Sequence, residues 1–312
     1  MKRTTIVVIA LMIAVIVTGC STNSTNSKNG LEKSEDYSQI MDNASVSYLG
    51  PAGTYTEEAA QFFFPTAANL LPEETVGEAI ADVVAGDTDY AVIPQENTLG
   101  GAVINYVDAL IEEEDVYVVG EVILPISQTL MGVPGASMDD IQIVCSHAQG
   151  ITQSAEWREA HLPNAVTQEM PSTAAAASYV AETGDKTIAA VAAPGAAKLY
   201  GLSVLAENVQ ITDANKTRFY VLSSSRLEEK SQPHAVFVAS CEASRIDDII
   251  VEIHNTGLEL VTIHDRPEGS WLGIYNYVIE VENPNGISEK QIEKLEAIPE
   301  IRFLGGFDVI EK

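Results

Sequence analysis

The sequence predicts an α/β protein made of two α/β lobes followed by a smaller module of βαββαβ order. Between residues 46 and 230, apolar runs of strand length alternate with helix-length segments, which indicates a parallel or mixed sheet in each lobe. After a break at Ser231-Gln232-Pro233, the patterns follow the order strand, helix, strand, strand, helix, strand. The 312 residues are enough for two domains with a proper core.

The elements of the two lobes are predicted from short apolar runs and from helix caps. Thr54 and Glu57 fit a capping box in front of the first helix, and Ser172 caps an alanine-rich helix. The expected strands are 46–49, 90–94, 116–124, 129–133, 141–145 and 189–193, and the expected helices are 58–64, 79–85, 103–110, 151–161, 174–180 and 194–200.

The C-terminal module, residues 231–312, is expected to form a ferredoxin-like sheet with two helices. Its predicted strands are 235–241, 258–264, 275–281 and 301–309, and its predicted helices are 245–255 and 288–298.

Residues 1–20 have the pattern of an export signal rather than of a folded element. Lys2 and Arg3 precede an apolar run at 6–17, which is too short to span a bilayer but has the length of a signal core. The run leads to Val-Thr-Gly-Cys, which is similar to a bacterial lipobox. We therefore expect Cys20 to be lipidated and to anchor the exported chain to the cell membrane, with residues 21–45 as a polar tether. The alternative is a plain secretory signal with a free cysteine.

The net charge of -28 argues against nucleic-acid partners and against electrostatic binding to an anionic membrane. An anionic substrate would need locally placed cations, and the two lobes have few. Between residues 46 and 230 the cationic residues are Arg158, Lys186, Lys198, Lys216, Arg218, Arg226 and Lys230. Cys145 and Cys241 lie in separate strands, so neither a disulfide nor a metal site is expected.

Two polar segments carry the candidate chemistry. Gln-Glu-Asn-Thr at 95–98 follows a buried strand, where open α/β sheets place ligand groups, although it could equally be a polar turn. Thr217 and Phe219 share one face of another predicted strand, and Arg218 points to the other face. Arg218 offers its planar fork to a carboxylate on a substrate or on the protein, or it is simply an exposed residue at a strand start.

Two further features are ambiguous when taken alone. The glycine turn at 50–53 could bind an anion on the unpaired first amides of the following helix, or it is an ordinary α/β turn. His147 is either a general acid or base, or a histidine that is hydrogen-bonded at a helix start.

Five segments occur in the order and at the spacing of prephenate dehydratase, over residues 46–225. They are GPAGTYT at 50–56, PQENTLGG at 94–101, SHAQ at 146–149, STAA at 172–175 and TRF at 217–219. The resemblance implies two lobes similar to a type II periplasmic binding protein, an active site in the cleft and a catalytic role for Thr217. Tyr55, Thr56 and Thr98 stand where Phe, Ser and Ser are usual and keep the chemistry, whereas Gln128 stands where a His is expected.

The reaction implied by this resemblance is the decarboxylating dehydration of prephenate to phenylpyruvate, without a metal or an organic cofactor. Thr217 would assist departure of the ring hydroxyl, and Arg218 together with helix N-termini would offset the carboxylates. Glu96 would orient Asn97 or hydrogen-bond Thr217. The residues expected to bind the substrate are Arg218, Phe219, Glu96, Asn97, Thr98, Thr54, Thr56, Ser172 and Thr173.

Two other functions fit the same sequence. The site could dehydrate arogenate, which carries an ammonium group where prephenate has a keto group. Alternatively, the chain is a lipid-anchored solute-binding protein that captures an aromatic compound or an amino acid and catalyses nothing.

The C-terminal module resembles the ACT regulatory domain that is usually fused to this enzyme. Asp265, Arg266 and Pro267 fall where the family carries its Glu-Ser-Arg-Pro effector motif, so they are the candidate effector-binding residues. His264 and Asp265 replace the Glu and the Ser, and the family's Gly-Ala-Leu is missing from residues 240–249. Regulation by phenylalanine, a structural turn and a homodimer formed by edge pairing of sheets are therefore all left open.

Overall fold

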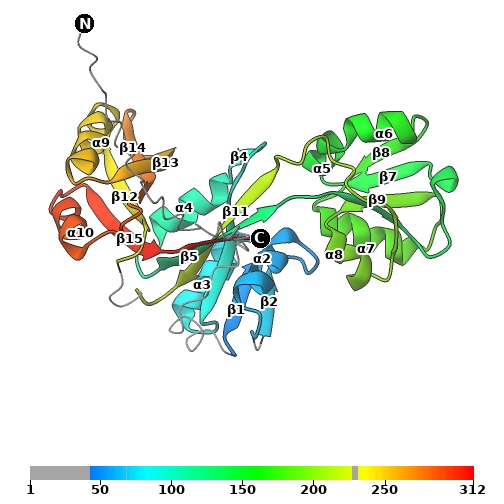
Figure 1. Cartoon of the computed structure of the whole chain (residues 1–312), viewed down its shortest axis with the longest axis horizontal. Helices are drawn as coiled ribbons and strands as arrows, with labels where there is room; N and C mark the ends of the chain where they lie inside the picture. The colour runs from blue at the N-terminus through cyan, green and yellow to red at the C-terminus, as the bar shows by residue number, and fades with distance from the viewer. Residues whose placement is uncertain (1–42, 68, 227–230) are drawn as a thin grey trace, which may run out of the picture. The chain divides into compact units, whose positions relative to one another are not determined.

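The computed structural model describes residues 43–67, 69–226 and 231–312. The predicted signal peptide, the lipidation site Cys20 and most of the polar tether lie outside these residues; the tether was expected to reach residue 45, but the first strand already begins at Ser45. The described strands form three sheets of seven, five and four strands (Figure 1). None of the helices in the described ranges is both long and apolar enough to cross a membrane.

The first sheet contains the Thr-Arg-Phe segment on one of its central strands. Its order is β16-β5-β11-β3-β1-β2, with β4 paired to β3. Strand β11 runs antiparallel to both of its neighbours, β3 and β5. The elements are β1 (Ser45–Leu49), α2 (Tyr55–Phe63), β2 (Asn69–Glu73), α3 (Val76–Ala85), β3 (Tyr90–Asn97), β4 (Gly101–Ala102), α4 (Ile104–Glu112), β5 (Tyr117–Pro125), β11 (Lys216–Ser223) and β16 (Val309–Glu311).

Helix α2 begins where the predicted cap stands, but its first turn differs from a capping box. The Thr54 hydroxyl accepts a hydrogen bond from the amide of Glu57, as expected for an N-cap. The Glu57 carboxylate reaches back to the amide of Gly53, at 2.6 Å, one residue before the position that a capping box requires. The helix therefore starts at Tyr55, three residues earlier than the sequence pattern suggested.

The second sheet has the order β10-β6-β9-β7-β8. Its elements are β6 (Thr129–Gly132), β7 (Ile143–Ser146), α5 (Ala148–Gln153), α6 (Ala155–His161), β8 (Val166–Glu169), α7 (Thr173–Thr183), β9 (Ile188–Ala192), α8 (Pro194–Leu199) and β10 (Ser203–Ala206). Strands β2, β8 and β10 are not among the predicted strands, because they lie at sheet edges, are exposed or only half-buried, and lack the apolar runs of the central strands.

The single helix predicted at 151–161 is wrong, because the chain breaks at Ser154 into α5 and α6. The Arg158 guanidinium donates to the carbonyl of Ile151 at 2.7 Å, and the Ser154 hydroxyl donates to the carbonyl of Gly150 at 2.7 Å. Side chains thus occupy carbonyls that face the end of α5, which is a known cause of helix bending.

The third sheet has the order β13-β14-β12-β15, and all of its neighbouring strands are antiparallel. Its elements are β12 (His234–Glu242), α9 (Ile246–Asn255), β13 (Glu259–Pro267), β14 (Ile274–Glu282), α10 (Glu289–Glu296) and β15 (Ile301–Phe307). The predicted βαββαβ order is therefore present. Cys145 and Cys241 are both free, as expected.

The last predicted strand, 301–309, is wrong at its C-terminal end, because the chain changes sheets there. The pairing of β15 with β12 shifts register between Phe303 and Gly305, and β16 then pairs in parallel with β5 of the first sheet. Gly305 has a φ of +142°, and a Cβ atom at this position would lie 2.1 Å from the carbonyl oxygen of Val118 in β5. Only glycine allows this close approach of the two backbones.

One hydrophobic core joins the first and third sheets. It includes Ile93 and Tyr220 from the first sheet, Val236 and Val278 from the third, and Tyr106 from α4 between them. Hence the C-terminal module is packed directly on the sheet that carries Thr217.

Candidate active site

The Thr217 side chain is hydrogen-bonded to Asn97 on the neighbouring strand. The two residues are partners in the antiparallel register of β11 and β3, and each is 9% exposed. The Asn97 amide nitrogen donates to the Thr217 hydroxyl at 2.9 Å. The orientation of this amide is fixed, because its oxygen accepts from the backbone amides of Leu99 at 3.1 Å and Gly100 at 2.9 Å.

This geometry leaves the Thr217 hydroxyl as an acceptor toward Asn97. A hydroxyl has one proton to donate, and no acceptor takes that proton anywhere in residues 43–67, 69–226 or 231–312. The Thr217 hydroxyl is thus able to donate a hydrogen bond or a proton to a bound molecule.

A network of neutral amides extends from this pair to the second sheet. The Gln149 amide in the SHAQ segment donates to the oxygen of Asn97 at 3.0 Å. Asn97 also donates to Asn215 at 2.8 Å, and Asn215 donates to Gln153 of α5 at 3.2 Å. The segments predicted around Asn97, Gln149 and Thr217 are therefore brought together at one place.

Asn215, Gln149 and Gln153 are not among the site residues predicted from the sequence. Asn215 is 1% exposed and Gln153 is 5% exposed. The feature of the sequence that could have identified them is their polarity within segments that are otherwise apolar or helical. A buried amide is nearly always hydrogen-bonded, so such a residue indicates a polar network.

Gln128 also belongs to this network. It is 3% exposed, and its amide nitrogen donates to Gln153 at 3.3 Å. Its side-chain oxygen has no hydrogen-bond partner within the described part of the chain. Gln128, which stands where the family pattern has a His, therefore places an unpaired acceptor oxygen beside the amide network.

Arg218 points to the opposite face of β11, as the strand periodicity predicted, and binds protein carboxylates. Its guanidinium makes two bonds of 2.7 Å to Glu121 of β5, and one of its nitrogens lies 2.6 and 2.7 Å from the oxygens of Glu280 on β14. Both carboxylate side chains are fully buried. Of the two partners expected for Arg218, a carboxylate of the substrate or of the protein, the structure shows carboxylates of the protein.

Three other predicted residues are placed differently from the expectation. Phe219 is 1% exposed and packs in the core of the first sheet, so it cannot line a cleft. Glu96 lies 3.7 Å from Arg218 and 3.8 Å from His264, and Asn97 takes the place beside Thr217 that was considered for Glu96. The Thr98 hydroxyl bonds the backbone of Lys216, on the strand that carries Thr217.

The remaining predicted residues lie at helix starts. Thr54 caps α2 and Ser172 caps α7, accepting from the amide of Ala175 at 2.9 Å. Thr56 is 5% exposed within α2, and Thr173 is the first residue of α7. Among the described residues, no hydrogen bond connects any of these four to Thr217.

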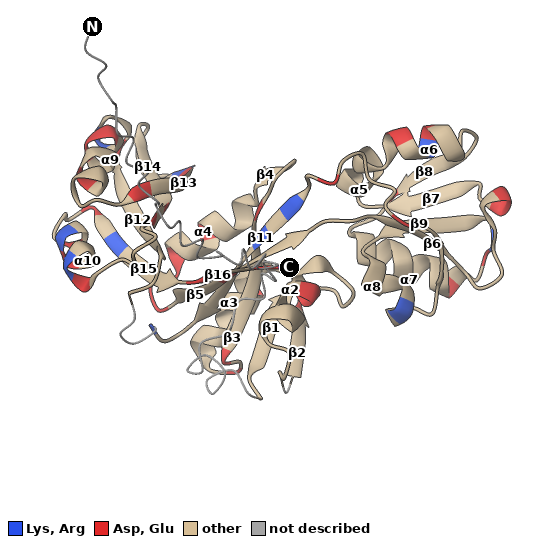
Figure 2. Ribbon diagram, in the orientation of Figure 1, with Lys and Arg blue, Asp and Glu red and all other residues tan. Residues whose placement is uncertain are grey.

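A cavity of about 860 Å³ lies at the start of α2. It is lined by that helix, by the β5–β6 connection and by α8, and it includes Thr54 together with Lys198 and Lys312. The Tyr55 hydroxyl bonds the carbonyl of Ser127 at its wall. The two lysines were not predicted as site residues, although cations are scarce among the many acidic residues (Figure 2).

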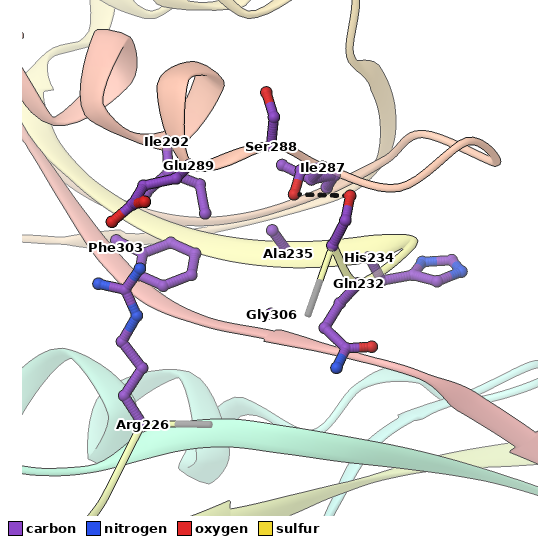
Figure 3. A pocket seen from close by; sticks show the side chains of 11 residues that line it. Arg226, Gln232, His234, Ala235, Ile287, Ser288, Glu289, Ile292, Phe303 and Gly306 are labelled. Atoms are coloured by element: carbon purple, nitrogen blue, oxygen red, sulfur yellow. Dashed lines mark hydrogen bonds between the residues drawn. The ribbon is translucent and has the colours of Figure 1, made fainter. Parts of the chain in front are cut away.

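A smaller cavity of about 280 Å³ lies beside α10 and β15 (Figure 3). Arg226 lies over the ring of Phe303 there, 4.7 Å from the ring centroid, and Glu289 lines the same cavity. None of the lining residues was predicted for the site.

The candidate effector residues lie on β13, beside α4. The Arg266 guanidinium makes two bonds to the carboxylate of Asp108, one of them at 3.0 Å, and His264 is hydrogen-bonded to the Tyr106 hydroxyl. Burial lowers the pKa of His264 below its ordinary value. In this structure Arg266 therefore holds β13 against the first sheet's helix.

The ion cluster around Arg218 shifts the pKa values of its members. Burial raises the pKa of Glu121 to about 7, although the hydrogen bonds from Arg218 act in the other direction. Burial would also raise the pKa of Glu280, but the nearby His234 and the charge and hydrogen bonds of Arg218 outweigh it and the pKa is lowered. Burial would lower the pKa of His234, but the Glu280 carboxylate outweighs burial, so the pKa of His234 is raised.

Comparison with known proteins adds independent information. A family model described as prephenate dehydratase matches residues 46–227. The bifunctional chorismate mutase/prephenate dehydratase of Stutzerimonas stutzeri is 33% identical over 237 residues, which cover 75% of this chain and 64% of that protein. The prephenate dehydratase of Bacillus subtilis is 30% identical over 278 residues, covering 84% of this chain and 98% of that protein.

A solved structure agrees with the sequence matches. Prephenate dehydratase from Arthrobacter aurescens, in complex with L-Phe, superimposes with a TM-score of 0.76 at 30% identity, covering 84% of this chain and 89% of that one. Thus the chain spans almost the whole Bacillus subtilis protein, but only 64% of the bifunctional relative.

Proposed function

Because the chain belongs to the prephenate dehydratase family, we propose that it converts prephenate to phenylpyruvate, with Thr217 as the catalytic residue. In this reaction the ring C–O bond and the C–C bond to the ring carboxylate both break. The electron pair of the C–C bond enters the ring, which becomes aromatic, while CO₂ and hydroxide leave and the hydroxide takes up a proton. The carbon skeleton needs no external oxidant or reductant.

The observation that carries the proposal is the direction of the hydrogen bond between Asn97 and Thr217. Asn97 donates to Thr217, so the Thr217 proton is available to the leaving hydroxyl. Such assistance is worth roughly 10²–10⁴-fold in rate. A threonine hydroxyl is neutral at all ordinary pH values, so it can donate at any of them.

The test is turnover of prephenate by the purified chain, followed through the alkaline ultraviolet absorbance of phenylpyruvate. We expect Thr217→Ala to lower kcat by roughly 10²–10⁴-fold while the circular dichroism spectrum stays unchanged. Thr167→Ala, at an exposed position of β8, is the matched control and should keep full activity. Unchanged turnover in folded Thr217→Ala would exclude this role.

Arogenate is the second candidate substrate. It differs from prephenate in carrying an ammonium group, which needs a hydrogen-bond acceptor, where prephenate has a keto group, which needs a donor. Comparing kcat/KM for arogenate, with phenylalanine as the product, and for prephenate decides between them. Binding of either compound without turnover would instead support the solute-binding protein.

We further propose that the first and second sheets form two lobes like those of type II periplasmic binding proteins, and that the third sheet is an ACT domain. The strand order β13-β14-β12-β15 and the relative solved with L-Phe support these assignments. Titration with phenylalanine tests the effector role of residues 265–267, and sedimentation tests a homodimer formed at a sheet edge. Unaltered activity at saturating phenylalanine would argue against the effector role.

We also propose that the chain is exported and anchored to the membrane through a lipid on Cys20. The support is the lipobox-like segment before that residue. Fractionation of cells that express the wild type and Cys20→Ala tests this, since only the wild type should sediment with membranes.

A further inference from the structure

Glu280 is a fully buried carboxylate of the third sheet that reaches the strands of the candidate active site. It accepts from Arg218 at 2.6 and 2.7 Å, from the Tyr220 hydroxyl at 2.9 Å and from the Gln95 amide at 3.2 Å. Arg218 and Tyr220 lie on β11 with Thr217, and Gln95 lies on β3 with Asn97. A single carboxylate of the C-terminal module therefore holds both strands that carry the Asn97–Thr217 pair.

Glu280 contacts the first sheet at a β-bulge between β3 and β11. Arg218 pairs with Glu96, whereas Phe219 pairs with Pro94, so Gln95 is the extra residue of β3 at this place. A bulge of this kind re-aims neighbouring side chains and leaves one residue without a partner on the opposite strand. Gln95 donates to Tyr220 at 2.7 Å and to Glu280, so the bulge is held from the side of the third sheet.

We propose that Glu280 is a positioning residue for the dehydratase site. The C-terminal module would then contribute directly to the geometry of that site. The proposal rests on the function proposed above. Glu280 acts through Arg218, Tyr220 and Gln95, and it fixes the register in which Asn97 meets Thr217.

The hydrogen bonds in the cluster, rather than its charges, explain why the carboxylate is needed there. Arg218 already has two bonds to Glu121, so it would keep a counter-charge without Glu280. The Tyr220 hydroxyl and the Gln95 amide, however, would lose an acceptor inside the core, where an unpaired polar group is costly. We therefore expect the loss of Glu280 to displace β3 and β11 locally rather than to release Arg218.

The experiment compares Glu280→Gln and Glu280→Asp in the purified full chain with the wild type. Glu280→Gln keeps the shape but removes the charge and one acceptor atom. Because small misplacements of reacting groups cost up to about 10²-fold, we expect kcat to fall about 10- to 100-fold with a smaller change in KM. Glu280→Asp keeps the charge and should recover part of kcat.

Glu259→Gln is the matched control, because Glu259 is an exposed carboxylate on the next strand of the same sheet. It should leave kcat and KM unchanged. A kcat within twofold of the wild type in Glu280→Gln, or an equal loss in Glu259→Gln, would overturn the proposal.

Amide hydrogen exchange supplies a measurement that does not depend on turnover. In Glu280→Gln, peptides that cover residues 94–101 and 215–222 should exchange faster, whereas peptides from the buried strand β9 should not change. If the wild type does not convert prephenate, the proposed function fails, and this exchange pattern alone decides whether Glu280 holds the two strands. Equal exchange in the two proteins would overturn the positioning role.

Discussion

Asn97 is the residue on which the direction of the Thr217 hydrogen bond depends. Its oxygen is used by two backbone amides and by Gln149, and its nitrogen is left to donate to Thr217. A residue of the same shape with two acceptor oxygens would keep the backbone bonds and reverse the bond to Thr217.

We therefore predict that Asn97→Asp loses activity without losing the fold. The new carboxylate would accept the Thr217 proton, which would then be unavailable to the leaving hydroxyl, and kcat should fall by roughly 10²–10⁴-fold. The check is kcat together with thermal unfolding, with Asn164→Asp at an exposed loop position as the control. Full activity in Asn97→Asp would show that the direction of this bond does not matter.

The sequence predicted which face each residue of the Thr-Arg-Phe segment occupies, but not what Arg218 binds. Alternation along a strand is local, so Thr217 and Arg218 could be assigned to opposite faces from the chain alone. The partners of Arg218 are separated from it by 97 residues for Glu121 and 62 for Glu280. No local pattern pairs residues at such separations, and one of the partners belongs to another sheet.

At the scale of elements, the change of sheet between β15 and β16 depends on Gly305. Its φ is +142°, and the β5 carbonyl occupies the space where a side chain would begin. The strand predicted from residue 301 extends through residue 309 because the apolar pattern continues into β16. The apolar pattern indicates which residues are buried but not which sheet a strand joins, so it could not predict that the chain changes sheets between β15 and β16.

We predict that Gly305→Ala destabilises the chain by about 2–4 kcal/mol, from overpacking against Val118 and from the positive φ. Gly77→Ala, within α3 and with no close contact inside 4.0 Å, should be neutral or slightly stabilising. Unfolding in denaturant, followed by fluorescence and circular dichroism, checks both variants. A stability of Gly305→Ala equal to that of the wild type would contradict the close approach of β15 and β5.

At the scale of the whole molecule, a buried ion cluster joins the first sheet to the third. Two carboxylates, Glu121 and Glu280, share Arg218, and His234 lies 3.5 Å from Glu280. The sequence predicts the two-lobed part, the C-terminal module and the βαββαβ succession of that module, but it assigns each part a separate role. Contacts between modules are made by residues far apart in the chain, so this connection appeared only in the structure.

The cluster should make stability depend on pH near neutrality. The titratable or charged groups that face it are Glu121 on β5, Arg218 and Tyr220 on β11, Glu96 on β3, Tyr106 on α4, His234 on β12, Glu282 and Glu280 on β14, and His264 on β13. A group whose pKa is raised by folding contributes stability at low pH, and this contribution is lost as the pH rises through the folded value. Glu121, with a pKa of about 7, and His234 both belong to this class.

The groups whose pKa values are lowered by folding change the stability only at lower pH. The lowered pKa of His264 costs stability only below about its ordinary value of 6.5. The lowered pKa of Glu280 contributes stability that is constant above its ordinary value of 4.5 and is lost only as the pH falls below that value. Above pH 6.5 the trend is therefore set by Glu121 and His234. We predict that the wild type loses about 1 kcal/mol of stability through Glu121 between roughly pH 6.5 and 8. The raised pKa of His234 adds a further loss in the same direction.

Glu121→Gln separates the two contributions, because it keeps the shape of the side chain and cannot titrate. Its melting temperature, measured by calorimetry from pH 6.5 upward, should fall less steeply with pH than that of the wild type. The exposed Glu156→Gln in α6, on the second sheet, should follow the wild-type slope, since its charge is remote from the cluster. A Glu121→Gln slope as steep as the wild-type slope would mean that Glu121 is already ionised at pH 6.5 in the folded chain, and that Arg218 compensates its burial completely.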